Sequence, residues 1–155
     1  MDAVSRLQQI IESVPDQLGM VSSERAARPS APGKWSPKQE LGHLIDSAAN
    51  NHQRIVRAQL ENRPAMPGYD GDRWVDLHAY QNADWNGLIE RWRAVNQQLL
   101  AAARAITPET AQRMLTVGGG EPITLQFLVE DYVAHLVHHL EHIGVPSFAA
   151  ATVSD

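Results

Sequence analysis

Histidines cluster near the end of the chain, where the stretch HLVHHLEH at residues 135–142 contains four of the seven. Imidazole is a preferred ligand of zinc, copper and nickel in proteins. In a helix, His135 and His139 would lie one turn apart on one face, so both rings can bind a single ion. The spacing therefore predicts a metal site, but histidine pairs at this spacing also occur in helices that bind no metal.

The apolar residues of the same segment indicate which rings point inward. They recur at helical spacing and form one stripe, made up of Leu125, Leu128, Val129, Tyr132, Val133, Leu136, Leu140 and Ile143. On a helical wheel, His139 falls inside this stripe and His135 falls at its edge. His138 and His142 fall further round, and we expect them to be mostly solvated.

A third ligand has to come from another segment, and the stretch between Ser36 and Pro64 contains two further histidines. His52 lies on the aliphatic stripe of this predicted helix, whereas His43 points away from the centre of the stripe. Periodicity therefore favours His52 as the inward residue. An inward histidine can equally be a packed, hydrogen-bonded one, so the spacing alone leaves the choice open.

Four long helices are predicted to position these groups. They cover residues 3–19, a segment that Ser36 caps and Pro64 closes, residues 85–106 and residues 124–143. Residues 20–35 are predicted to form a polar loop and residues 63–83 a long connection with aromatic side chains. Strand alternation is visible at most over residues 114–117. We therefore expect an all-α four-helix bundle with long crossover connections, as one domain over residues 1–148 followed by a tail at 149–155.

Composition limits the chemistry and the partners. The 155 residues include no cysteine, which excludes disulfides, thiolate metal ligands and a cysteine nucleophile. The formal charge of −5 argues against a nucleic-acid-binding protein. The first ten residues contain Asp2 and Arg6 and no continuous apolar run, so neither a signal peptide nor a membrane span is expected. We expect a cytoplasmic protein that binds neither nucleic acid nor membranes.

Two motifs together resemble a known family. The two motifs are GKWSPKQELGHLIDS and the later YVAHLVHHLEHI. The stretches YDGDRWV, ADWNGLIERW and ITLQFLVEDYVAHL, which lie between these motifs or overlap them, fit the same pattern. The chain resembles the DinB-like and YfiT-like four-helix-bundle proteins over nearly its whole length. The resemblance implies that His43 joins His135 and His139 in holding a divalent metal, in contrast to the choice of His52 by periodicity. Three imidazoles suit zinc or nickel and leave coordination positions open for water or substrate.

Further residues are candidates for supporting roles. Asp46 and Asp131 lie one turn from His43 and His135, so each could accept a hydrogen bond from a ligand imidazole, although either could equally be a solvated helix acid. Tyr69, Arg73 and Trp74 in the long connection could line a cofactor pocket, with the arginine binding a carboxylate. The alternative is that these aromatic side chains simply pack over the bundle.

The resemblance implies a function as well as a fold. The family includes metal-dependent transferases that use low-molecular-weight thiols such as bacillithiol or mycothiol, so we expect thiol S-transfer to a small-molecule substrate ahead of metal-dependent hydrolysis. A different class of function is a non-catalytic metal-binding or interaction bundle, in which the ion stabilises the fold. Bundles of this kind often pair across a two-fold axis, and we expect a homodimer.

Overall fold

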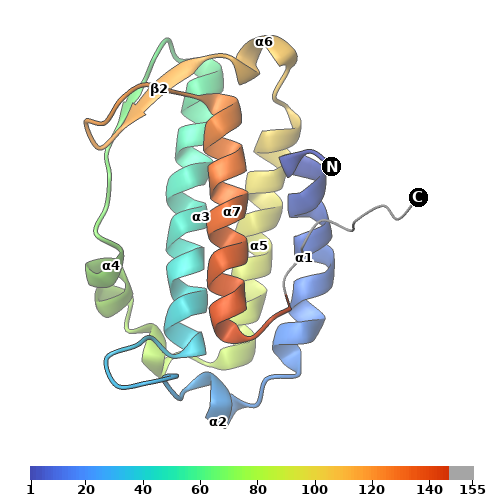
Figure 1. Ribbon diagram of the computed structural model, residues 1–155, viewed down its shortest axis with the longest axis vertical. Coiled ribbons are helices and arrows are strands. Elements are labelled where there is room, and N and C mark those ends of the chain that lie inside the picture. The colour runs from blue at the N-terminus through green and yellow to red at the C-terminus, as the bar shows by residue number, and fades with distance from the viewer. Residues whose placement is uncertain (147–155) are drawn as a thin grey trace.

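The computed structural model describes residues 1–146, and the predicted tail at 149–155 lies outside the described residues. Four long helices lie side by side, as Figure 1 shows: α1 (Ala3–Gly19), α3 (Pro37–Leu60), α5 (Trp85–Arg104) and α7 (Leu125–Ile143). The predicted all-α four-helix bundle is confirmed. Within residues 1–146, no helix is both long enough and apolar enough to cross a membrane.

Short elements join the long helices. They are α2 (Ser23–Ala26), β1 (Ala65–Met66), α4 (Gly71–His78), the 3-10 helix η1 (Tyr80–Asn82), α6 (Pro108–Ala111), β2 (Met114–Val117) and β3 (Ile123–Thr124). The three strands form one small sheet, in which β1 is parallel to β2 and β2 is antiparallel to β3. The possible strand at 114–117 is therefore confirmed. The connection at 63–83 is not irregular throughout, since it contains β1, α4 and η1.

The direction of the helices follows from this connection. It returns the chain along the outside of the bundle, past α4, to the end at which α3 began, so α3 and α5 run parallel (Figure 1). Helix α7 runs opposite to α3 and packs against it, while α1 packs against α5 and α7. The beginning of α3 consequently lies beside the end of α7.

Local sequence signals account for the ends of these two helices. Ser36 and Gln39 form a reciprocal capping box at the start of α3, with Pro37 in the first turn, where a missing N–H costs nothing. The side chain of Thr124 caps α7, and Gly144 ends it in the left-handed conformation with φ 93°. The caps fix which turns of the two helices face each other.

A close approach between α3 and η1 shapes the bundle end that contains these turns. Gly42 lies directly under the ring of Tyr80, and the Tyr80 hydroxyl donates to Asp46 Oδ1 at 2.6 Å. Asp46 is only 3% exposed, and burial raises the pKa of its carboxyl, an effect that the hydrogen bonds from Tyr80 and His78 oppose. Glycine at position 42 therefore leaves room for the Tyr80 ring, so that its hydroxyl reaches Asp46.

Replacing Gly42 by alanine is expected to destabilise the protein. A β-carbon there would lie 2.2 Å from two ring atoms of Tyr80, so the ring has to move. We expect a loss of about 1–3 kcal/mol in the free energy of unfolding, measured by urea denaturation. Gly19→Ala is the matched control, because nothing lies within 4 Å of a β-carbon at that helical position. Equal stability of the two variants would contradict the steric argument.

Candidate metal centre

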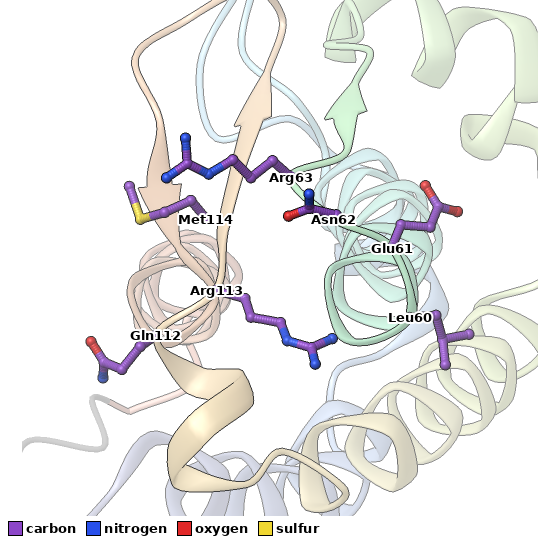
Figure 2. Close-up of a pocket in the computed structure, with 7 residues that line it drawn as sticks. All are labelled: Leu60, Glu61, Asn62, Arg63, Gln112, Arg113 and Met114. Atoms are coloured by element: carbon purple, nitrogen blue, oxygen red, sulfur yellow. The ribbon is translucent and has the colours of Figure 1, made fainter.

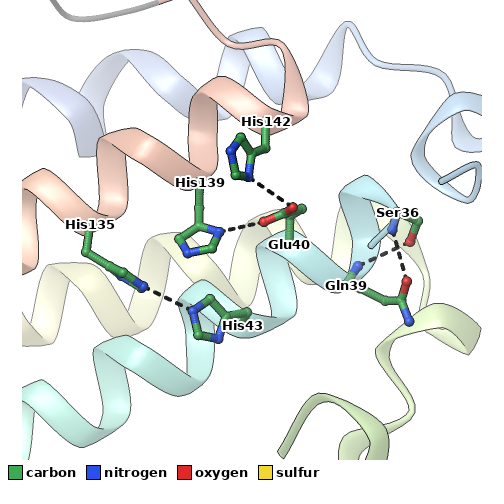
Figure 3. A network of polar contacts seen from close by, with 7 residues as sticks. All are labelled: Ser36, Gln39, Glu40, His43, His135, His139 and His142. Carbon is green, nitrogen blue, oxygen red and sulfur yellow. Dashed lines mark hydrogen bonds and ion pairs between the residues drawn. The ribbon is translucent and has the colours of Figure 1, made fainter. Parts of the chain in front are cut away.

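Three histidines converge where the start of α3 lies against the end of α7. His43 comes from α3, and His135 and His139 come from α7. Each offers one ring nitrogen, and the three nitrogens lie within 4.8 Å of one another. Figure 3 shows His43 pointing across to His135, with 3.1 Å between their Nε2 atoms. The structure thus brings together the three residues that the family resemblance selects.

Burial keeps two of these rings neutral. The pKa of His43 is lowered from 6.5 to about 4, chiefly by burial and also by the charges of His139 and His135, while the charge of Glu40 opposes the shift. The pKa of His135 also falls to about 4, again chiefly through burial, with His139 contributing and Asp131 opposing. A neutral imidazole has a free lone pair for a metal, so both rings are in the ligand-competent state at neutral pH.

Glu40 supplies a carboxylate beside the histidines. It precedes His43 by one turn of α3, and its Oε2 lies 2.6 Å from Nδ1 of His139 (Figure 3). In that arrangement Nδ1–H of His139 donates to the carboxylate, which leaves the Nε2 lone pair free. Metal-binding histidines commonly donate their second N–H to a carboxylate in this way. Glu40 therefore has the supporting role that the sequence analysis assigned to Asp46 and Asp131.

The two aspartates lie elsewhere. The Asp46 carboxylate binds Tyr80 and lies 3.1 Å from Nδ1 of His78, without a hydrogen bond to His43. Asp131 is exposed on α7 and lines a cavity next to His135, where its charge raises the pKa of that histidine. Neither forms a hydrogen bond with a ligand imidazole, so the predicted bonding of Asp46 and Asp131 to the ligands is not observed.

The remaining histidines differ in their surroundings. His138 and His142 are exposed, as expected, but His142 also approaches Glu40, with 3.3 Å between its Nδ1 and Oε1. The group Glu40, His139 and His142 is a second set of close metal-ligating atoms. His52, which the helical wheel favoured, is half-buried later in α3 and belongs to neither group among the described residues.

The donor set fits a divalent metal. Tetrahedral zinc with Zn–N bonds of about 2.0–2.1 Å requires neighbouring nitrogens about 3.3–3.4 Å apart, close to the 3.1 Å between His43 and His135. The other nitrogen of His43, Nδ1, is buried without a hydrogen-bond partner among the described residues and faces Gly71 at the start of α4. The hydrogen-bond partner of Nε2 is Nε2 of His135, which is itself a candidate ligand. Three imidazoles and a supporting carboxylate match the chemistry of an open metal site.

A cavity opens beside His135, between α3 and α7. Its volume is about 210 Å³, and its lining residues are Ser47, Asn51, Arg54, Tyr69, Val117, Ile123, Leu128, Asp131, Tyr132 and His135. Of the three residues proposed from the long connection, Tyr69 lines this cavity. Trp74 packs against Tyr69, with 5.2 Å between ring centroids, and Arg73 is exposed on α4. The buried guanidinium at the cavity belongs instead to Arg54.

Size alone does not identify the site. A larger hollow, of about 490 Å³, lies at the other end of the bundle, where α3 ends and β2 begins (Figure 2). It is an open, polar depression around Arg63 and Arg113, and Arg113 donates to the carbonyl of Gln59 near the end of α3. None of the histidines lines it. The candidate ligand His135 lines the smaller cavity instead.

Glu40 and Arg54 were missed in the sequence. Glu40 could have been found, because residues three apart on a helix share a face with each other and His43 is three positions later. Arg54 gave no comparable signal: arginines are usually exposed, and its burial depends on the crossover chain packing over α3.

Comparison with known proteins gives a consistent result. The family model of the DinB superfamily matches residues 3–143. The Bacillus subtilis protein named "Putative metal-dependent hydrolase YfiT" is 29% identical over 140 residues, which cover 87% of this chain and 79% of that protein. A similarly named protein from Oceanobacillus iheyensis is 23% identical over 139 residues, covering 87% of this chain and 80% of the relative.

Solved structures show the same fold. The structure of Bacillus subtilis YfiT, described as a probable metal-dependent hydrolase with an unusual four-helix bundle topology, superposes with a TM-score of 0.79 at 27% identity, covering 91% of this chain and 83% of that one. A mycothiol-dependent maleylpyruvate isomerase has a TM-score of 0.75 at 10% identity, covering 94% of this chain and 60% of that one. At that identity the second likeness concerns the fold alone.

The metal-free protein is expected to lose stability as the pH falls from about 6.5 toward about 4. In this range the unfolded chain protonates His43 and His135 at their usual pKa of 6.5, whereas the folded chain keeps both neutral down to about 4. The unfolded state then binds more protons, so acid favours unfolding. Urea denaturation of the apo-protein across this range measures the slope of the unfolding free energy against pH. His43→Gln should reduce this slope and His52→Gln should not. Equal slopes in the wild type and both variants would contradict the prediction.

Removing the Glu40 carboxylate is expected to weaken metal binding. Glu40→Gln loses the charged acceptor for His139 Nδ1–H, and losses of about 10- to 100-fold in affinity are typical for such partners. Competition with a chelator measures the zinc affinity directly. Glu141→Gln is the control: it changes an exposed acid on α7, two residues after His139, and should leave the affinity unchanged. An unchanged affinity for Glu40→Gln would remove Glu40 from the site.

Proposed function

The chain belongs to the DinB superfamily, and we propose that it is a divalent-metal-dependent enzyme whose metal is held by His43, His135 and His139. The observation that supports this proposal is the convergence of three imidazoles from two antiparallel helices beside a cavity. Structural metal sites usually have four protein ligands, whereas catalytic sites keep a position open. Three nitrogen ligands next to a cavity match the second type.

The ligands suit zinc or nickel, because imidazole is favourable for both and the chain contains no thiolate. When bound, such a cation supplies Lewis-acid activation of a water or a thiol near neutral pH. The residues of the chain hold and orient the site: Glu40 fixes the ring of His139, and Trp35 packs over His43 with 5.0 Å between ring centroids. Asp131, at the cavity beside His135, is placed to accept a released proton.

Hydrolysis is the reaction that we propose first. The names of the relatives at 23–29% identity support it, and it requires only a water at the open position. This reverses the order expected from the sequence, where thiol S-transfer came first.

Thiol S-transfer is the second candidate. One observation favours it: the cavity beside His135 contains the buried cation Arg54, which suits a carboxylate-bearing thiol. The small-molecule substrate, the cytoplasmic location and the homodimer stay predictions.

Metal content tests the proposal directly. We expect about one zinc or nickel ion per chain in the purified protein, measured by mass spectrometry, because three imidazoles hold catalytic metals in this manner. His43→Ala and His139→Ala should lose the ion, since each removes a ligand, and His52→Ala should retain it. If His52→Ala loses the metal while His43→Ala retains it, the proposed ligand set is wrong.

Activity assays on the metal-loaded protein separate the candidate reactions. Turnover of an activated ester that stops when the metal is removed supports hydrolysis. Metal-dependent consumption of an electrophile only when a thiol is added supports S-transfer. A non-catalytic bundle is supported if the metal raises the melting temperature, neither activity is found, and added thiols do not bind the metal.

A further inference from the structure

A buried cation lies at the far end of the cavity that begins at His135. Arg54, on α3, is only 8% exposed. Its NH1 group donates to Asn51 Oδ1 at 3.3 Å and its NH2 group donates to the carbonyl of Pro67 at 3.1 Å. A guanidinium has five N–H donors, so with two in use, three have no partner among the residues that the structure describes.

The charge of Arg54 is balanced by no carboxylate among the described residues. It forms no ion pair within residues 1–146, and its neighbour Tyr69 presents a ring, with 5.8 Å from the guanidinium carbon to the ring centroid. Burial lowers the pKa of Arg54, while Tyr69 opposes this effect. Asp131 lines the same cavity, but it is exposed and forms no ion pair with Arg54. Because a buried charge without a partner is costly, the site is complementary to an anion from outside.

The position of Arg54 relative to the histidines sets the length of a ligand that could reach both. His43, Ser47, Asn51 and Arg54 follow one another along one face of α3. Arg54 is bonded to Asn51, which lies about 12 Å along the helix axis from His43 at about 1.5 Å per residue. The contacts that the ligand makes with the metal at one end and with Arg54 at the other take up part of this distance. The ligand itself then needs roughly six bonds, at about 1.2 Å per extended bond.

We propose that Arg54 binds the carboxylate of an elongated small molecule whose other end reaches the three-histidine site. This inference rests on the proposed function, because it takes the metal as the site of the ligand's reactive end. A planar guanidinium pairs with a carboxylate through two parallel hydrogen bonds. A single cation with Asp131 at the same cavity favours one negative charge over a phosphate dianion.

The side chains between the two ends are suited to such a ligand. Ser47, Asn51 and Tyr69 present polar groups along the cavity, while Leu128 and Ile123 cover its other side. The Ser47 hydroxyl already accepts from the Asn51 amide at 3.3 Å, which holds Asn51 toward Arg54. An apolar chain with a carboxylate at one end and a metal-binding group at the other matches this lining.

Mercapto-acids of different length test the proposal on the cobalt(II)-loaded protein, in which a bound thiolate gives a charge-transfer absorption. We expect 6-mercaptohexanoate to bind about 10- to 100-fold more tightly than 6-mercaptohexanol, since a hydrogen-bonded charge contributes about 1.5–3 kcal/mol. Mercaptoacetate is too short and should bind Arg54→Met as well as it binds the wild type.

Arg54→Met should lose the preference for 6-mercaptohexanoate, Arg54→Lys should keep part of it, and Arg57→Gln should keep it all. Arg57 is the matched control because it lies on the same helix, exposed and paired with Glu61.

A second measurement uses the wild-type protein alone and needs no metal. The side-chain Nε–H resonance of Arg54 in the wild-type apo-protein, assigned through its bonded connection to the Arg54 backbone, should shift on titration with hexanoate and not with hexanol. If the protein takes up no cobalt, the proposed metal function falls, and this shift still decides the anion site. No preference for the carboxylate in the wild type, an equal preference in Arg54→Met, or an unmoved Arg54 resonance would each overturn the inference.

Discussion

The antiparallel contact between α3 and α7 is the constraint on which the site depends. It places the first turns of one helix against the last turns of the other, so that His43 lies 3.1 Å from His135, nitrogen to nitrogen. Burial in this contact keeps both rings neutral, with pKa values of about 4. The same packing that stabilises the bundle therefore prepares the lone pairs that a metal requires.

The polar groups along α3 fall into two sets. Glu40 and His43 come first and face the end of α7, while Ser47, Asn51 and Arg54 follow on the same face and line the cavity. A carboxylate supports the histidine end and a guanidinium occupies the other end. In our proposal, this arrangement gives the cavity a metal-binding end and an anion-binding end.

The long connection between α3 and α5 contributes more than a return path. It delivers Tyr69 to the cavity and Gly71 to the ring of His43, and its carbonyl at Pro67 fixes the guanidinium of Arg54. It also brings Tyr80 over Gly42, where the tyrosine hydroxyl satisfies the buried Asp46. A segment without a long helix thus positions several of the groups around the site.

The four long helices could be predicted from the sequence, because their caps and apolar periodicity are local signals, and the histidine pair one turn apart on α7 is also local. The family motif singled out His43, whereas helical periodicity favoured His52, since a wheel records the average apolar face and not which turn meets α7. Glu40 was within reach of the helical spacing, yet its bond to His139 joins residues 99 positions apart. The burial of Arg54 and the bonding of Asp46 to Tyr80 were decided only by the tertiary structure, because both depend on where the crossover chain packs against α3.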